Sequence, residues 1–247
     1  MGTTVKNMGI MYYMDASNMD YWQLNKKIKR CPDDISITGC NGQRFIGSGL
    51  EHKSLKIPGV PGNALGAFMN GATIEVFGNA QDAVGDTMND VRIVIHGNIG
   101  DAAGYSMRGG ELFIEGDAGY RAGIHMKAYG DKLPLLVIGG KAGSFLGKYQ
   151  AGGIIIVLGL TDNKSPIVNY FPCTGMHGGK VYLRSDCKNL KFPSQVTATP
   201  AIEEDMDEIS SYLKTYCSSF DKSYESITDH SFTVIRPDSK IHTDRCM

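Results

Sequence analysis

The chain has 247 residues, of which 42% are apolar and 21% charged, enough for one large domain or for one domain with small extensions. Its 25 basic and 26 acidic side chains leave a net charge of −1, which argues against a nucleic-acid-binding protein or an anionic-membrane surface. No apolar run approaches the roughly 18 residues of a membrane span, and no signal peptide is recognisable. Six cysteines without a CxxC pair indicate free thiols, so we expect a cytoplasmic protein.

Residues 1–33 are predicted to form an N-terminal extension with one short helix. Met19, Trp22, Leu24 and Ile28 recur at helical spacing within residues 15–33. The segment Asp33–Thr38 then enters a repeated region.

Glycine marks that repeat. The chain contains 31 glycines, about one residue in eight, compared with a typical ~7%. Two sets of glycines follow a period of 19 residues, interrupted in the later repeats. The first set is Gly47, Gly66, Gly85, Gly104, Gly123 and Gly147, and the second is Gly59, Gly78, Gly97, Gly116, Gly140 and Gly159. A fixed period over this length predicts a repeat architecture in which glycine serves tight corners or close backbone approach.

Apolar columns share the same period. One column is Leu55, Ile74, Ile93, Leu112, Leu136, Ile155 and Val181, and a second apolar column lies two residues further along each repeat. Apolar positions two apart predict a strand with one face turned inward. A third column of mostly methionine, from Leu50 to Met176, is expected to fill the interior. Residues 34–185 are therefore predicted to form an all-β, right-handed parallel β-helix, a single-stranded solenoid of about seven coils of 19 residues with short helical caps.

Two coils are longer than the others. The extra residues fall near Lys127–Pro134 and near Leu160–Val168. Insertions in a solenoid form surface loops, so both are natural places for contact with another molecule.

Residues 186–247 are predicted to contain a C-terminal amphipathic helix over 202–220 followed by loop and tail over 221–247. Ile202, Met206, Ile209, Leu213 and Phe220 are spaced three or four apart, and acidic residues occupy the first turn.

One outward-facing column is apolar from the third coil onward. Its members Phe113, Val137, Ile156 and Tyr182 form a candidate interface, because an apolar stripe on a solenoid must be covered. The chain's own C-terminal helix or a partner chain could cover it, and we favour the helix.

Motifs for catalysis and for cofactor or metal binding are missing from the sequence. GGKAGS at 139–144 is not a phosphate-binding loop, and GYSMR at 104–108 lacks the last glycine of a nucleophile elbow. His125 aligns with Ser106, and His177 aligns with Lys127 and Arg108 in successive coils, but neither column is a ligand cluster. Carboxylates for a glycoside-cleaving β-helix could come from Glu75, Glu111, Glu115, Asp86, Asp90 and Asp101. We assign no catalytic, cofactor-binding or metal-binding residue.

The stretch from Asn41 to Arg184, about 60% of the chain, resembles a known family. Its marks are NGQRFIGSGL, GNALGAFMNGATIEVFGNAQDAVGDTMND, GDAAGYSMRGGELFIEGDAGYRAGIHM and GMHGGKVYLR. They resemble the GXGXG β-helix domain at the C-terminal end of the glutamate synthase large subunit, in its free-standing form. The β-helix subunits of formylmethanofuran dehydrogenase and N-methylglutamate synthase are similar relatives.

This resemblance implies a non-catalytic scaffold subunit that positions a glutamine amidotransferase chain and an FMN-binding synthase chain. FMN and an iron–sulfur cluster would then belong to the partner chains and not to this one. The alternative is the equivalent subunit of a formylmethanofuran dehydrogenase or N-methylglutamate synthase complex. A third hypothesis, from another class, is an independent β-helix hydrolase. A homo-oligomer is left open by the sequence.

Overall fold

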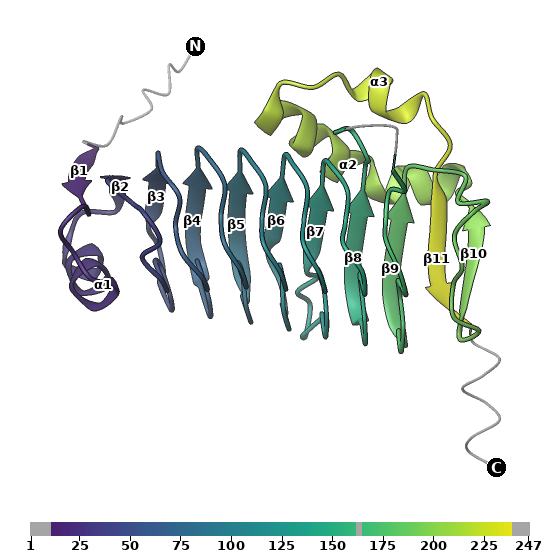
Figure 1. Cartoon of the computed structure of the whole chain (residues 1–247), viewed down its shortest axis with the longest axis horizontal. Helices are drawn as coiled ribbons and strands as arrows, with labels where there is room; N and C mark the ends of the chain where they lie inside the picture. Colours follow the sequence, from purple (N-terminus) through teal and green to yellow (C-terminus); the bar gives the residue numbers. More distant parts are fainter. Residues whose placement is uncertain (1–10, 162–164, 239–247) are drawn as a thin grey trace, which may run out of the picture.

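The computed structural model describes residues 11–161 and 165–238, which form a parallel β-helix closed at both ends by additional elements (Figure 1). Its eleven-stranded sheet has the order β1-β2-β3-β4-β5-β6-β7-β8-β9-β11-β10. The strands are β1 (Tyr12–Asp15), β2 (Asp34–Thr38), β3 (Ser54–Ile57), β4 (Asn70–Val76), β5 (Asp90–Ile95), β6 (Glu111–Ile114), β7 (Leu135–Ile138), β8 (Ala151–Val157), β9 (Gly178–Leu183), β10 (Val196–Pro200) and β11 (Thr233–Pro237). The helices are α1 (Tyr21–Arg30), α2 (Glu203–Phe220) and α3 (Tyr224–Thr228). The predicted all-β parallel β-helix is confirmed.

The register of the sheet follows the 19-residue period. Ile74 pairs with Ile93, and Ile93 with Leu112, so the first apolar column of the sequence forms one continuous inward row. Met69, Met88, Met107 and Met126 are completely buried and fill the interior, as predicted. Isolated parallel bridges between Ala80, Ile99, Ala118 and Ala142 join the coils along a second side.

Glycine serves two different physical needs in the coils, as one member of each set shows. Gly123 has φ +69°, in the left-handed region that favours glycine, and an added Cβ would lie 2.3 Å from Ile155 Cδ1. Gly97 does not have a positive φ. Its Cβ would instead lie 2.5 Å from Asn79 Oδ1 and 2.7 Å from the Gly78 carbonyl oxygen. Gly123 therefore makes a corner, whereas Gly97 lets one coil approach the side chain below it.

That approach accommodates a ladder of side-chain caps. Asn79 Oδ1 accepts from the Asn98 amide at 2.8 Å, Asn98 Oδ1 accepts from the Asp117 amide at 2.8 Å, and Asp117 Oδ1 accepts from the Lys141 amide at 2.7 Å. A parallel ladder includes Asp82 and Asp101. Each cap supplies an acceptor to an N–H group at a corner, where strand pairing does not reach. Sequence analysis missed these ladders, although Asn79, Asn98 and Asp82, Asp101 are spaced by 19.

Gln150 interrupts the methionine column for a local reason. The pairing of β8 with β9 shifts register between Ala151 and Ile154. The completely buried Gln150 side chain donates from Nε2 to the carbonyls of Gly152 at 3.3 Å and Gly153 at 3.1 Å. A methionine could not satisfy these carbonyls.

The N-terminal extension closes the first end of the solenoid. Helix α1 begins with a capping box, in which Asp20 accepts from the Gln23 amide at 2.8 Å and Gln23 Oε1 accepts from the Asp20 amide at 3.2 Å. Leu24 and Ile28 are buried, whereas Trp22 is exposed. Strand β1, which was not predicted, pairs in parallel with β2 and extends the sheet into residues 1–33.

The C-terminal end requires a correction. Residues 202–220 were predicted to be helical and form α2, but the segment predicted as loop and tail contains α3 and β11. Strand β11 lies antiparallel between β9 and β10. It does so because Val234 packs against the cluster beneath α2 while its neighbour Ile235 faces the solenoid core. The sheet thus crosses both boundaries placed around residues 34–185. Residues 239–247 of the predicted tail lie outside the described residues.

Candidate functional site

Helix α2 covers the apolar stripe on the outside of the coils (Figure 1). The stripe residues pack with Ile209, Leu213, Tyr216 and Phe220 from one face of the helix. Because the stripe spans β5 to β9, a single helix is tied to five successive strands.

Polar groups fix the helix at its N-terminal half. Glu208 accepts from Lys180 Nζ at 2.6 Å and from the Tyr182 hydroxyl, and Asp205 pairs with Arg236 of β11. Desolvation opposes ionisation of Glu208, but the hydrogen bonds from Lys180 and Tyr182 outweigh it and lower its pKa. Burial first, and then the Glu208 hydrogen bond, raise the pKa of Tyr182.

The candidate interface of Phe113, Val137, Ile156 and Tyr182 is therefore corrected. All four side chains are completely buried within this chain, because α2 lies on them. The chain's own helix is the occupant of the stripe, and the four residues offer no exposed surface to a partner.

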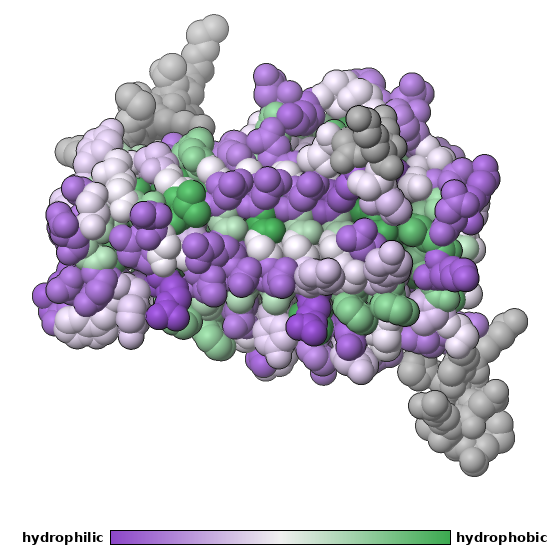
Figure 2. Space-filling model, viewed as in Figure 1, coloured by the Kyte–Doolittle hydropathy of each residue, from purple (hydrophilic) through white to green (hydrophobic). Residues whose placement is uncertain are grey.

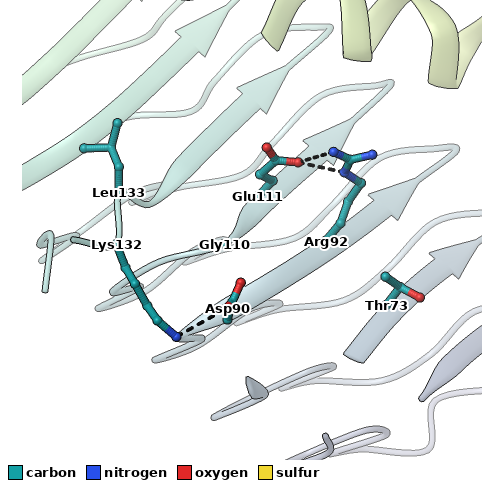
Figure 3. Close-up of a pocket in the computed structure, with 7 residues that line it drawn as sticks. All are labelled: Thr73, Asp90, Arg92, Gly110, Glu111, Lys132 and Leu133. Carbon is teal, nitrogen blue, oxygen red and sulfur yellow. Dashed lines mark hydrogen bonds and ion pairs between the residues drawn. The ribbon is translucent and has the colours of Figure 1, made fainter. Parts of the chain in front are cut away.

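One of the cavities described contains two of the six proposed carboxylates (Figure 3). It has a volume of about 480 Å³ and lies beside the Lys127–Pro134 insertion. Glu111 pairs with Arg92 at 2.6 Å, and Asp90 pairs with Lys132 of the insertion at 3.2 Å. Each carboxylate thus faces a cation across its own ion pair, instead of facing a substrate together with the other carboxylate.

The other proposed carboxylates also have structural partners. Glu75 pairs with His96 at 3.0 Å, Glu115 with Lys222 at 2.9 Å, and Asp86 accepts from the Thr87 hydroxyl. Asp101 belongs to the cap ladder. Within the described ranges, no group of three or more His, Cys, Asp or Glu side chains could hold a metal ion.

Buried cysteines are held as neutral thiols. Burial raises the pKa of Cys40 to about 11 and that of Cys173 to about 12. Cys173 lies in the core cluster of the solenoid. These are inert, packed thiols and not nucleophiles.

A second cavity lies on the other side of the same insertion and is basic. It has a volume of about 350 Å³ and is lined by Ser106, Arg108, His125, Lys127, Ala128 and Tyr129. Arg108 and Lys127 come from equivalent positions of successive coils, and the Arg108 guanidinium lies 5.9 Å from the centre of the Tyr129 ring. The columns that sequence analysis interpreted as polar surface thus meet in a hollow that the insertion closes on one side.

Aromatic rings continue this surface along the next coil. His125 stacks on Tyr149 with ring centroids 5.2 Å apart, and Lys148 Nζ lies 5.2 Å from the Tyr149 ring centre. We call the surface formed by Arg108, His125, Lys127, Tyr129, Lys148 and Tyr149 the aromatic–basic corner.

Figure 2 shows one face of the solenoid coloured by hydropathy. Hydrophilic side chains form rows along the solenoid, with weakly polar and apolar residues in narrow bands between them. None of the helices that the structure describes is long and apolar enough to cross a bilayer.

Comparison with known proteins places this architecture in a family. The model of the GXGXG motif family matches residues 26–237, which is most of the chain. The chain belongs to the GXGXG family. This match extends the resemblance seen over residues 41–184 into the terminal elements.

Two similar proteins show how far the likeness reaches in sequence and in fold. The uncharacterized protein MJ1350 of Methanocaldococcus jannaschii is 44% identical over 241 residues, covering 92% of each chain. A chain of the formyltransferase/hydrolase complex FhcABCD of Methylorubrum extorquens, crystallised with methylofuran, has a TM-score of 0.60 at 18% identity. That likeness covers 88% of this chain and 90% of the other, and it shows a shared fold.

Proposed function

We propose that this GXGXG chain is a non-catalytic scaffold subunit of a glutamate synthase-type complex. In this proposal it positions a glutamine amidotransferase chain and an FMN-binding synthase chain, between which the amide nitrogen of glutamine is transferred to 2-oxoglutarate. FMN and the iron–sulfur cluster reside in the partner chains. The observation that carries the proposal is the family match over residues 26–237.

The physical form of the chain supports a scaffold. A stack of hydrogen-bonded coils is a rigid rod, and its surface loops occur at fixed heights along the axis. Both insertions lie in the half of the rod that α2 clamps. A docking surface there is held by a stiff platform, which suits a subunit that fixes two other chains relative to each other.

The alternative is a subunit of a formylmethanofuran dehydrogenase or N-methylglutamate synthase complex. The fold that the chain shares with a subunit of the FhcABCD complex favours this alternative over an independent hydrolase. The ion-paired carboxylates of the first cavity also weigh against the hydrolase.

Affinity purification of the tagged chain from its own cells, with the co-purifying chains identified by mass spectrometry, tests the proposal. We expect an amidotransferase chain and an FMN-binding chain in fixed ratio, a flavin absorbance spectrum, and formation of glutamate from glutamine and 2-oxoglutarate. The chain purified alone should be inactive in this assay.

Three results would decide against this proposal. Formyltransferase or methyl-transfer chains in the purified complex would establish the alternative. Glutamate formation by the isolated chain would contradict a scaffold role. Recovery of the tagged chain without any co-purifying protein would contradict the role of an obligate subunit.

A further inference from the structure

In the described part of the chain, the aromatic–basic corner brings cations that form no ion pair together with aromatic rings at one cavity. Arg92, Lys132, Lys180 and Lys222 each form an ion pair with a carboxylate. Among the residues the structure describes, Arg108, Lys127 and Lys148 form none, and no carboxylate lines the cavity between Arg108 and Lys127. In a chain of net charge −1, this cluster is a local concentration of positive charge.

The aromatic side chains at the corner are exposed and held in place. Tyr129 is 66% exposed and Tyr149 is 44% exposed. His125 lies between Tyr105 and Tyr149, with ring centroids 5.9 and 5.2 Å away. On the adjoining coil Phe145 stacks on Phe171, with ring centroids 5.4 Å apart. Rings fixed by stacking lose little side-chain entropy when a partner covers them.

The backbone at this place tolerates strain to present large side chains. Arg121, Phe145 and Phe171 have φ between +59° and +64°, a conformation that is strained for a non-glycine residue. The equivalent position in three earlier coils is alanine, at Ala64, Ala83 and Ala102. The first coil carries Phe45 there with φ +59°, so large side chains occupy this position in the first coil and again in the coils beside the insertions.

We propose that the aromatic–basic corner is the docking surface for an acidic segment of a partner protein chain. Carboxylates of that segment enter the cavity and accept hydrogen bonds from Arg108 and Lys127, and its apolar side chains pack on Tyr129 and Tyr149. Arginine and tyrosine are the residue types that dominate binding at protein interfaces. The inference deepens the proposed function, on which it rests for the existence of a partner, by naming the face and the chemistry of the contact.

A protein segment fits this surface better than a nucleic acid. The cations of the corner lie at one cavity and its rim. A chain with net charge −1 also lacks the long-range field that polyanion binders use.

A binding assay on the full chain tests the chemistry without requiring the natural partner. The probe is a fluorescein-labelled eight-residue peptide with four glutamates and two phenylalanines, measured by fluorescence anisotropy. We expect saturable binding that weakens with salt, and at least a tenfold loss in R108E/K127E. The control K26E/K29E makes the same charge change on exposed positions of α1 and should bind like the wild type.

The controls separate other occupants. The same peptide with glutamine in place of glutamate should not bind, and neither inorganic phosphate nor a single-stranded DNA of equal charge should displace the acidic peptide efficiently. Efficient displacement by phosphate or DNA, or equal binding by both double variants, would overturn the inference. If circular dichroism shows that R108E/K127E does not fold, R108Q/K127Q replaces it in every comparison.

Photo-cross-linking in the source cells then tests the place of contact. The cross-linker p-benzoylphenylalanine is introduced at Tyr149 or, as a control, at Tyr13, which is 75% exposed on β1 at the other end. We expect Tyr149 to cross-link to an acidic peptide of a co-purifying chain, and R108E/K127E to abolish this product.

The peptide-binding assay and the cross-linking experiment together distinguish failure of the inference from failure of the proposed function. A stable complex with cross-links from Tyr13 alone would refute the docking surface and leave the scaffold role intact. Specific peptide binding without any co-purifying chain would retain the corner as an acidic-segment site and refute the scaffold.

Discussion

Gly123 and Gly130 share a left-handed backbone but differ in what surrounds them. Gly123 has φ +69° and Gly130 has φ +58°, yet a Cβ on Gly130 would meet nothing within 4 Å, whereas one on Gly123 would lie 2.3 Å from Ile155 Cδ1. We expect Gly130→Ala to cost about 1 kcal/mol for the backbone alone. Gly123→Ala should cost about 2–4 kcal/mol, because Ile155 must also move. Equal urea-unfolding midpoints for the two variants would contradict this account of the corner.

Cys173 gives the stability of the protein a dependence on pH. Burial raises its pKa from the ordinary 9.0 to about 12, so the folded state keeps the proton that the unfolded state releases. Its contribution is fully present below pH 9 and is lost as the pH rises toward 12. The free energy of unfolding in urea should therefore decline less between pH 7 and pH 10 for Cys173→Ala than for the wild type. An unchanged decline would mean that this thiol does not titrate on unfolding.

At the scale of single elements, the contact between α2 and the stripe is a small hydrophobic core of its own. Ile156 is completely buried beneath the helix. Ile156→Asp would bury an unpaired charge, so we expect a loss of at least about 3 kcal/mol or release of α2 from the sheet. Hydrogen exchange of the α2 amides measures this release. The control Ser218→Asp, on the exposed face of α2, should leave exchange nearly unchanged.

The strands of the coils could be predicted because each residue is constrained twice. Ile74 is apolar because its strand has one inward face, and it recurs as Ile93 because the next coil repeats that face. Strand β11 has neither constraint, since it is short, antiparallel and outside the repeat. Its alternation of Val234 and Ile235 between two cores gives no single apolar face, so it was interpreted as part of a tail.

The candidate site was visible in part. The spacing of Arg108 and Lys127 by 19 residues places them in adjacent coils, and the insertion was predicted to be a loop beside them. What sequence could not supply is where that loop folds. Tyr129 and Lys132 form a bridge that turns the Tyr129 ring toward Arg108 and sends Lys132 to Asp90. These contacts divide the surface into one ion-paired cavity and one with unpaired cations.

At the scale of the whole molecule, the rod consists of two parts that differ in connectivity. Coils containing β2 to β4 contact chiefly their neighbours, whereas β5 to β9 are also joined through α2. A repeat stack with nearest-neighbour contacts opens from its ends, but a helix across several coils makes them open together. We expect hydrogen exchange to show one common opening free energy for β5 to β9 and lower values toward β2.

A core substitution should separate these two parts. Met69→Ala leaves a cavity in an early coil and should cost about 2–4 kcal/mol. The opening free energy measured by hydrogen exchange should fall for the amides of β3 and β4 and change little for those of β8 and β9. An equal fall in opening free energy over all strands would show that the solenoid unfolds as one unit.

The position of β11 also has a consequence for synthesis. It follows β9 and β10 in the sequence and is therefore made after both, yet it lies between them. Until it arrives, the hydrogen-bonding edge of β9 and part of the surface beneath α2 have no cover. A chain that ends before β11 would therefore expose an unpaired strand edge that quality control can recognise, and a covered edge would report that synthesis has passed β11.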